Sequence, residues 1–221
     1  MVDVPQQIGA VSRSFSVEEH DGEELNVQTL TQEYPADIDD VWDAATSASR
    51  IARWFLPVSG ELRLGGRYQL EGNAGGEILS CDPPLDGTAE YRITWEFGGG
   101  VTWVRVRLTA EGPARTRLEL EHTARSSEVP GEFWEMFGPG ATGVGWDGGL
   151  LGLAQHLGAI EGSITPEEAA AWAVTDEGKA FYRAASTAWG EAHRASGADA
   201  ETAARAADAC YAFYTGEAPA G

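Results

Sequence analysis

The clearest pattern in the chain is an alternation of apolar and polar residues over its middle third. In residues 89–97, large apolar side chains alternate with Arg92, Thr94 and Glu96. The same period of two returns in residues 102–108 and 118–122. Such a period is typical of strands with one buried and one solvent-exposed face. The sequence therefore predicts an antiparallel sheet, to which shorter alternating segments before residue 82 add further strands.

Apolar residues at helical spacing flank this alternating region. A strand over Leu25–Tyr34 is predicted to stop at Pro35, which cannot donate to a strand ladder. Asp37 then begins a short helix as its N-cap, and a second short helix starts near Ser49. A longer amphipathic helix is predicted over residues 145–157, with an apolar face that can lie across the sheet.

Four further expectations complete the course of the chain. Residues 8–17 read as a first strand, which forms a hairpin with Leu25–Tyr34. Pro83-Pro84 is expected to end the strand that starts at Glu77. Residues 126–145 read as irregular, and the Gly138–Gly143 segment within them as a tight loop rather than a dinucleotide site, because no parallel strand–helix–strand unit surrounds it.

From Ser163 the composition changes to alanine-rich helix. Thr165-Pro-Glu-Glu168 is a capping box with proline at the first helical position, which marks a helix start. Two more amphipathic helices follow. We interpret this part as an appended helical module that either packs on the main domain or pairs two chains.

The order of strand, two short helices, about five antiparallel strands and a long helix is the helix-grip arrangement. Local sequences strengthen this reading: Tyr34-Pro35, Val41-Trp42-Asp43-Ala44, Arg53-Trp54-Phe55, Gly65-Gly66-Arg67-Tyr68, Thr94-Trp95-Glu96 and Gly145-Trp146-Asp147. Together they resemble the START-like, or SRPBCC, superfamily over residues 25–160. The branch that they resemble most is that of the AHSA-like proteins, homologues of the heat-shock chaperone ATPase activator.

The resemblance implies an α+β helix-grip fold, in which a curved antiparallel sheet wraps around a long C-terminal helix with a hydrophobic cavity between them. Residues 1–160 would form this domain, including an N-terminal hairpin over residues 1–24, and residues 161–221 a helical extension. Members bind lipids, sterols, polyketides or hormones, some are cyclases or aromatases, and the AHSA-like branch suggests a link to chaperones and stress response.

The net charge of the chain limits the classes of partner that it can bind. Its net charge is −20 and its pI is near 4.4. Binding to nucleic-acid phosphates or anionic lipid needs a basic surface, so neither is expected. With no apolar run long enough for a membrane span and no signal-peptide pattern, we expect a cytoplasmic protein. Cys81 and Cys210 read as reduced thiols, and the scattered histidines predict no metal site and no cofactor.

Apolar strand faces, the long helix and nearby aromatic residues supply the candidate ligand-binding residues. They are Trp54, Phe55, Tyr68, Leu70, Ile93, Trp95, Val104, Val106, Leu118, Leu120, His122, Phe133, Trp134, Phe137, Trp146 and Leu150. Trp54, Phe55 and the three aromatics of residues 133–137 are expected at the mouth of the cavity. His122 has the strand parity of Leu118 and Leu120, so it should point inward. It is either a satisfied buried histidine or a weak candidate for acid–base catalysis.

Three functions remain open. The preferred hypothesis is non-catalytic binding of a small apolar molecule. The second is a polyketide cyclase or aromatase that uses His122. The third is an interaction protein that regulates a chaperone through its acidic surface or through residues 163–221, which also offer a homodimer contact.

Overall fold

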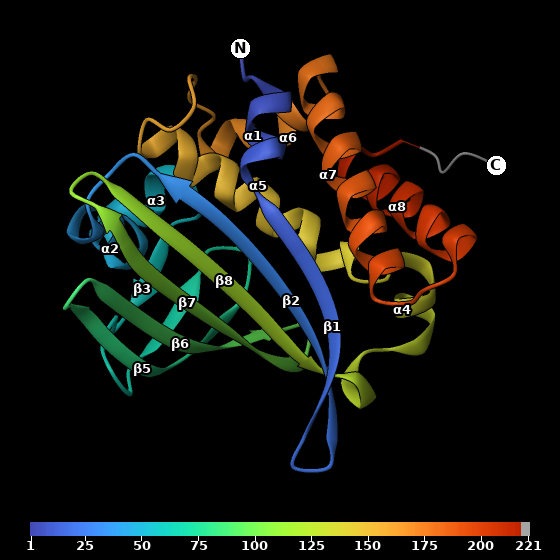
Figure 1. The fold of residues 1–221 in the computed structure, drawn as a ribbon, viewed down its shortest axis with the longest axis horizontal. Coiled ribbons are helices and arrows are strands. Elements are labelled where there is room, and N and C mark those ends of the chain that lie inside the picture. Colours follow the sequence, from blue (N-terminus) through green and yellow to red (C-terminus); the bar gives the residue numbers. More distant parts are fainter. Residues whose placement is uncertain (218–221) are drawn as a thin grey trace.

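A computed structural model, which describes residues 1–217, contains one curved antiparallel sheet of eight strands within that range (Figure 1). The strands are β1 Ser12–His20, β2 Glu23–Tyr34, β3 Val58–Gly60, β4 Arg67–Leu70, β5 Gly75–Leu85, β6 Thr88–Phe97, β7 Gly100–Gly112 and β8 Arg115–Arg125. Their order across the sheet is β1-β2-β8-β7-β6-β5-β4-β3.

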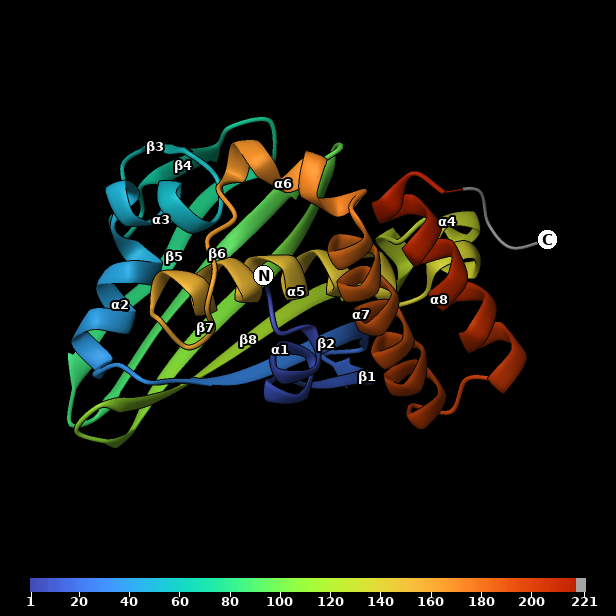
Figure 2. The ribbon, with the colours of Figure 1, turned by 90° about the horizontal axis from the view of Figure 1, so that it is seen from above.

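Helix α5 (Gly140–His156) crosses the strands on the concave face of the sheet (Figure 2). Helices α2 (Ile38–Thr46) and α3 (Ala48–Trp54) connect β2 to β3 and cover the same face. The Asp37 side chain caps α2 by accepting a hydrogen bond from the Asp40 amide. This arrangement confirms the helix-grip fold.

Strand register places the alternating apolar residues under α5. Val106 of β7 lies opposite Leu120 of β8, and Leu108 lies opposite Leu118. All four side chains are buried, whereas Arg107 and Glu119 lie opposite each other on the outer face, where Arg107 forms an ion pair with Glu90. The period of two thus separates a core face from a charged face, as the sequence predicts.

The first strand is shorter than expected, because a helix precedes it. Helix α1 occupies Val4–Ala10, and β1 begins only at Ser12. The Asp3 side chain accepts a hydrogen bond from the Gln6 amide, and Pro5 lies in the first turn, where its missing N–H costs nothing. These local start signals override the loose alternation of residues 8–17, and the predicted strand is wrong up to residue 11.

Two other predictions are wrong at element boundaries. Strand β5 runs through Pro83-Pro84 to Leu85, because a register shift between Asp82 and Leu85 spares the prolines a ladder hydrogen bond. The segment read as irregular contains a 3₁₀ turn, η1 (Ser126–Glu128), and helix α4 (Gly131–Phe137).

Helix α5 begins at Gly140, five residues before the predicted start, so the expected loop over 138–143 is largely helical. A β-carbon at Gly143 would overlap the indole ring of Trp189, and one at Gly140 would lie 2.7 Å from Cys210 Sγ. Gly140 and Gly143 therefore permit close helix packing, whereas Gly138, with a φ of 51°, ends α4.

The C-terminal helices pack on the sheet domain along α5 and at the end of α3. They are α6 (Pro166–Ala173), α7 (Asp176–Ala195) and α8 (Ala200–Thr215). Helix α7 contacts α5 and β1, and α8 lies outside it (Figure 2). The capping box of Thr165 and Glu168 is formed, as predicted. Pairing of two chains through these helices stays a prediction.

A buried cluster around Asp147 joins the C-terminal helices to the sheet domain. Arg13 Nη2 of β1 lies 2.6 Å from Asp147 Oδ1 of α5, and Trp189 Nε1 of α7 donates to Asp147 Oδ2 at 2.9 Å. Burial raises the pKa of the Asp147 carboxyl, while the charge and hydrogen bonds of Arg13 and the bond from Trp189 oppose that shift. Within residues 1–217, no helix is long and apolar enough to cross a membrane.

Candidate ligand-binding site

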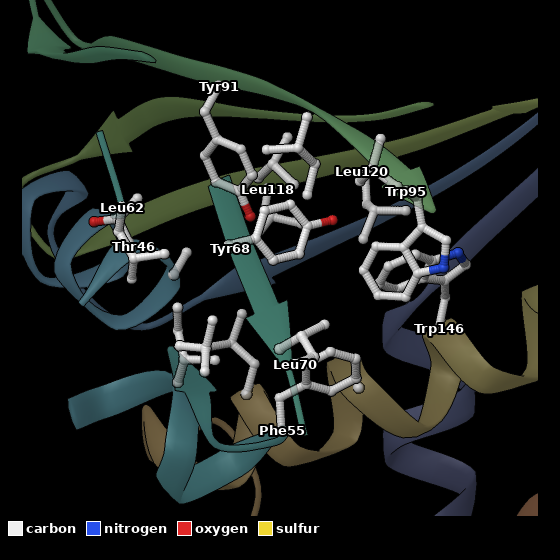
Figure 3. A pocket seen from close by; sticks show the side chains of 18 of the residues that line it. Thr46, Phe55, Leu62, Tyr68, Leu70, Tyr91, Trp95, Leu118, Leu120 and Trp146 are labelled. Atoms are coloured by element: carbon white, nitrogen blue, oxygen red, sulfur yellow. The ribbon is translucent and has the colours of Figure 1, made fainter. Parts of the chain in front are cut away.

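A cavity of about 140 Å³ lies between the concave face of the sheet, α3 and α5 (Figure 3). Its walls are almost entirely aliphatic and aromatic. Twelve of the predicted residues line it: Trp54, Phe55, Tyr68, Leu70, Ile93, Trp95, Val104, Val106, Leu118, Leu120, Trp146 and Leu150. The structure thus brings together residues from the end of α3, from α5 and from four strands, β4, β6, β7 and β8, that lie up to about a hundred positions apart.

Further side chains line the cavity that sequence reasoning missed. They are Ala45, Thr46, Ile51, Val58, Leu62, Ile78, Cys81, Tyr91, Gly149 and Leu153. Tyr91 could have been found, because it shares strand parity with Ile93 and Trp95. Residues of α2, α3 and the short strand β3 show no period long enough to reveal which side faces the cavity.

Three aromatic rings in mutual contact, of which two are stacked, line one end of the cavity. The Trp95 and Trp146 rings lie 4.9 Å apart, and Phe55 stacks on Trp146 with 6.2 Å between ring centroids and 18° between planes. The Trp54 indole N–H donates to Ala44 O at 3.0 Å, which anchors α3 against α2. Aromatic contacts of this kind hold their rings in defined positions.

Few polar groups reach the cavity. The Tyr68 hydroxyl donates to Thr94 O at 2.7 Å, and burial raises its pKa. Burial also raises the pKa of Tyr91, and the same cause, with Asp82 nearby, raises that of the Cys81 thiol. These groups are therefore neutral near pH 7, and the wall carries no carboxylate, lysine or arginine. These walls therefore suit an apolar molecule, which needs no hydrogen-bond partner.

His122 is buried on the concave face, as its parity predicts, but it does not line the cavity. It lies behind Trp146, whose indole N–H donates to His122 Nδ1 at 3.0 Å, and His122 Nε2 lies 2.7 Å from Thr102 Oγ1. Burial lowers the pKa of His122 to about 4. With Nδ1 accepting, the neutral ring carries its proton on Nε2 and donates to Thr102. The histidine therefore orients Trp146, a role that strand parity alone could not reveal.

Phe133, Trp134 and Phe137 lie away from the cavity, so their predicted place at its mouth is wrong. Helix α4 packs against α8 instead. Phe137 lies 5.7 Å from Phe213 of α8, and Trp134 lies 5.3 Å from Phe15 of β1. Helix α4 thus packs between α8 and the sheet through these aromatic side chains.

Metal binding has no geometric support in the described part of the chain. Among residues 1–217, no three His, Cys, Asp or Glu side chains gather closely enough to hold an ion.

Comparison with known proteins agrees with the observed fold. The family model described as "Activator of Hsp90 ATPase homolog 1-like protein" matches residues 35–158, more than half of the sequence. The chain belongs to this family. Membership confirms the predicted resemblance to AHSA-like proteins of the START-like superfamily, and the matched segment contains the entire cavity wall.

Solved structures extend the likeness beyond that segment. The crystal structure of CalU16 from Micromonospora echinospora is 35% identical, with 67% of this chain and 86% of CalU16 covered at a TM-score of 0.56. The solution NMR structure of CalU16 covers 85% of this chain and 97% of its own at 30% identity and a TM-score of 0.65. A search of curated proteins finds no match.

Proposed function

We propose that this member of the activator of Hsp90 ATPase homolog 1-like family binds a small apolar molecule in the cavity beneath α5. The observation that carries the proposal is the apolar hollow of about 140 Å³ between the concave face of the sheet, α3 and α5. An apolar cavity of about 150 Å³ stays dry and accepts one benzene-sized molecule. Filling it restores dispersion contacts that the lining side chains lack.

The positions of the titratable groups favour binding over catalysis. Both ring nitrogens of His122 are engaged, and Trp146 lies between the histidine and the cavity. A general base must reach the proton that it removes, within about 3 Å or through one water. The cyclase hypothesis therefore requires a rearrangement of Trp146, which the binding hypothesis does not.

The family description favours a second candidate, because it names an activator of the Hsp90 ATPase. Under this hypothesis the chain contacts a chaperone through its outer surface, and the net charge of −20 would make the contact sensitive to salt. A change in the ATPase rate of purified Hsp90 on adding this protein, lost at high salt, would support it. An unchanged rate at every salt concentration would contradict it.

Toluene titration followed by calorimetry and Trp fluorescence tests the binding proposal. Wild type is expected to bind toluene and to show a fluorescence change from Trp95 and Trp146 at the cavity wall. Val106→Phe places a ring in the hollow and should weaken toluene binding about tenfold or more, which corresponds to about 1.4 kcal/mol.

Val101→Phe is the matched control, since Val101 lies on the same strand but is exposed. It should bind toluene like wild type. The proposal fails if wild type binds no toluene, or if both variants bind it equally while near-UV circular dichroism shows that both are folded. Native mass spectrometry of the purified protein then searches for the natural ligand.

A further inference from the structure

A second hollow lies on the other side of the Phe55 ring from the cavity. It is a cleft of about 210 Å³ between the end of α3, the Gly145–Gly152 side of α5, helices α6 and α7, and Tyr214 of α8. Trp54, Phe55 and Gly149 line both hollows. The partition between them is therefore no thicker than two aromatic side chains and the backbone of α5.

Phe55 is the residue of this partition that lies outside both helices. Its ring is only partly buried, and it lies on the α5 backbone, since a β-carbon at Gly149 would meet the ring at 3.5 Å. It follows the last residue of α3, so its backbone is outside the helix. A change in the χ angles of this one side chain would give up its stacking on Trp146 but would leave both helices folded.

The cleft contains a hydrogen-bond donor that the protein does not use. Tyr182 of α7 lines the cleft, and burial alone raises its pKa, with no hydrogen bond contributing among the described residues. Neighbouring Tyr214, stacked on Tyr182 with 5.3 Å between ring centroids, donates instead to Ala141 O at 2.8 Å. The Tyr182 hydroxyl is thus a protonated donor that faces the cleft without an acceptor.

Gly148 keeps the cleft open opposite this hydroxyl. A β-carbon there would meet only Tyr182 Oη, at an ordinary contact distance of 3.7 Å. Packing therefore does not require glycine at this position, although glycine is unfavourable inside a helix. A side chain longer than alanine would extend into the space beside Tyr182.

The sizes of the two hollows also point to joint use. Ligand pockets commonly measure about 300–1,000 Å³, and the cavity alone falls below that range. The combined volume of the cavity and the cleft falls within that range. Both hollows have mainly apolar walls, and the cleft adds the Tyr182 hydroxyl.

We propose that the cavity and the cleft are two subsites of one site for an elongated amphipathic molecule that passes the Phe55 ring. Its apolar end occupies the cavity, and an oxygen acceptor near its other end receives the Tyr182 hydroxyl proton in the cleft. This inference rests on the proposed function, because it assigns the apolar end to the same cavity.

Two probes separate the subsites: toluene, which the cavity alone accommodates, and 6-phenylhexan-1-ol, whose alkyl chain and hydroxyl reach the cleft. Calorimetry on wild type, Gly148→Leu and Tyr182→Phe measures both affinities. Tyr182→Phe should weaken phenylhexanol binding about three- to tenfold, the effect of one neutral hydrogen bond. Gly148→Leu should weaken it about tenfold or more, and both variants should bind toluene like wild type.

Tyr211→Phe is the control, because Tyr211 lies on α8 beneath Arg183 and does not line the cleft. It should leave both affinities unchanged. If toluene binds but neither cleft variant changes the ratio of the two affinities, the two-subsite inference is overturned and the cavity proposal stands. If wild type binds neither probe, both proposals fail.

Discussion

The two halves of α5 have opposite surroundings. The first half, Gly140–Asp147, packs closely against α7 and α8 at Gly140 and Gly143, carries a buried ion pair with Arg13, and reaches the hollows only at Gly145 and Trp146. The second half, Gly148–His156, borders the cavity on one side and the cleft on the other. One helix thus joins a solid region to a hollow one.

Both halves are rich in glycine, but for different physical reasons. At Gly143 a larger residue would overlap Trp189, whereas at Gly148 an added methyl group would make only an ordinary contact. The comparison teaches that glycine content alone does not distinguish a helix packed tightly on its neighbour from a helix that leaves space. The atoms opposite each glycine make that distinction.

The largest expected effect is on the packed half. Asp147→Ala leaves the Arg13 guanidinium buried without its carboxylate, and loss of one partner of a buried pair costs about 3–5 kcal/mol. Chemical denaturation should show this loss in the free energy of unfolding. Arg205→Ala, which removes an exposed pair with Glu201, should change stability by no more than about 0.5 kcal/mol. Equal losses in both variants would contradict the assignment of Asp147 as the central contact.

The next prediction concerns His122, which accepts a hydrogen bond from Trp146 at the boundary between the two halves of α5. The pKa of His122 is about 4 in the folded chain and near 6.5 when unfolded. Between these values the unfolded state binds more protons, so falling pH favours unfolding. Protonation of His122 in the unfolded state should therefore lower the free energy of unfolding by about 3 kcal/mol as the pH falls from 6.5 to 4.

His122→Gln cannot titrate and should lose correspondingly less stability over that range. Denaturation curves of wild type and variant at several pH values measure the difference. His20→Gln, at the exposed β1–β2 turn, is the control and should follow the wild-type profile. Parallel profiles of wild type and His122→Gln would refute a buried, neutral histidine.

The smallest effects compare the two glycines directly. Gly143→Ala should destabilise the fold by about 1–3 kcal/mol, because its methyl group overlaps the Trp189 ring. Gly148→Ala should instead stabilise it by up to about 1 kcal/mol through higher helix propensity. Thermal unfolding of the two variants reports opposite shifts, and shifts of the same sign would remove the distinction between the halves.

Much of the sheet could be predicted from the sequence, because alternation over β6, β7 and β8 directly encodes a buried face. Prolines and caps placed α2 and α6 correctly. Helix α4 and the start of α5 were missed, since glycine at Gly140 and Gly143 reads as a loop unless Cys210 and Trp189 are known to face it. The aromatic residues of α4 were misassigned because nothing in the local sequence shows that they contact α8.

By itself, the sequence determined the helix-grip topology, the inward parity of the strands and most residues of the cavity wall, because these follow from periodicity and local start and stop signals. Tertiary structure decided that Trp146 screens His122, that α4 fastens α8, and that a cleft lies beyond Phe55. Such features depend on which distant side chains meet, and no local pattern records the shape of the space between them.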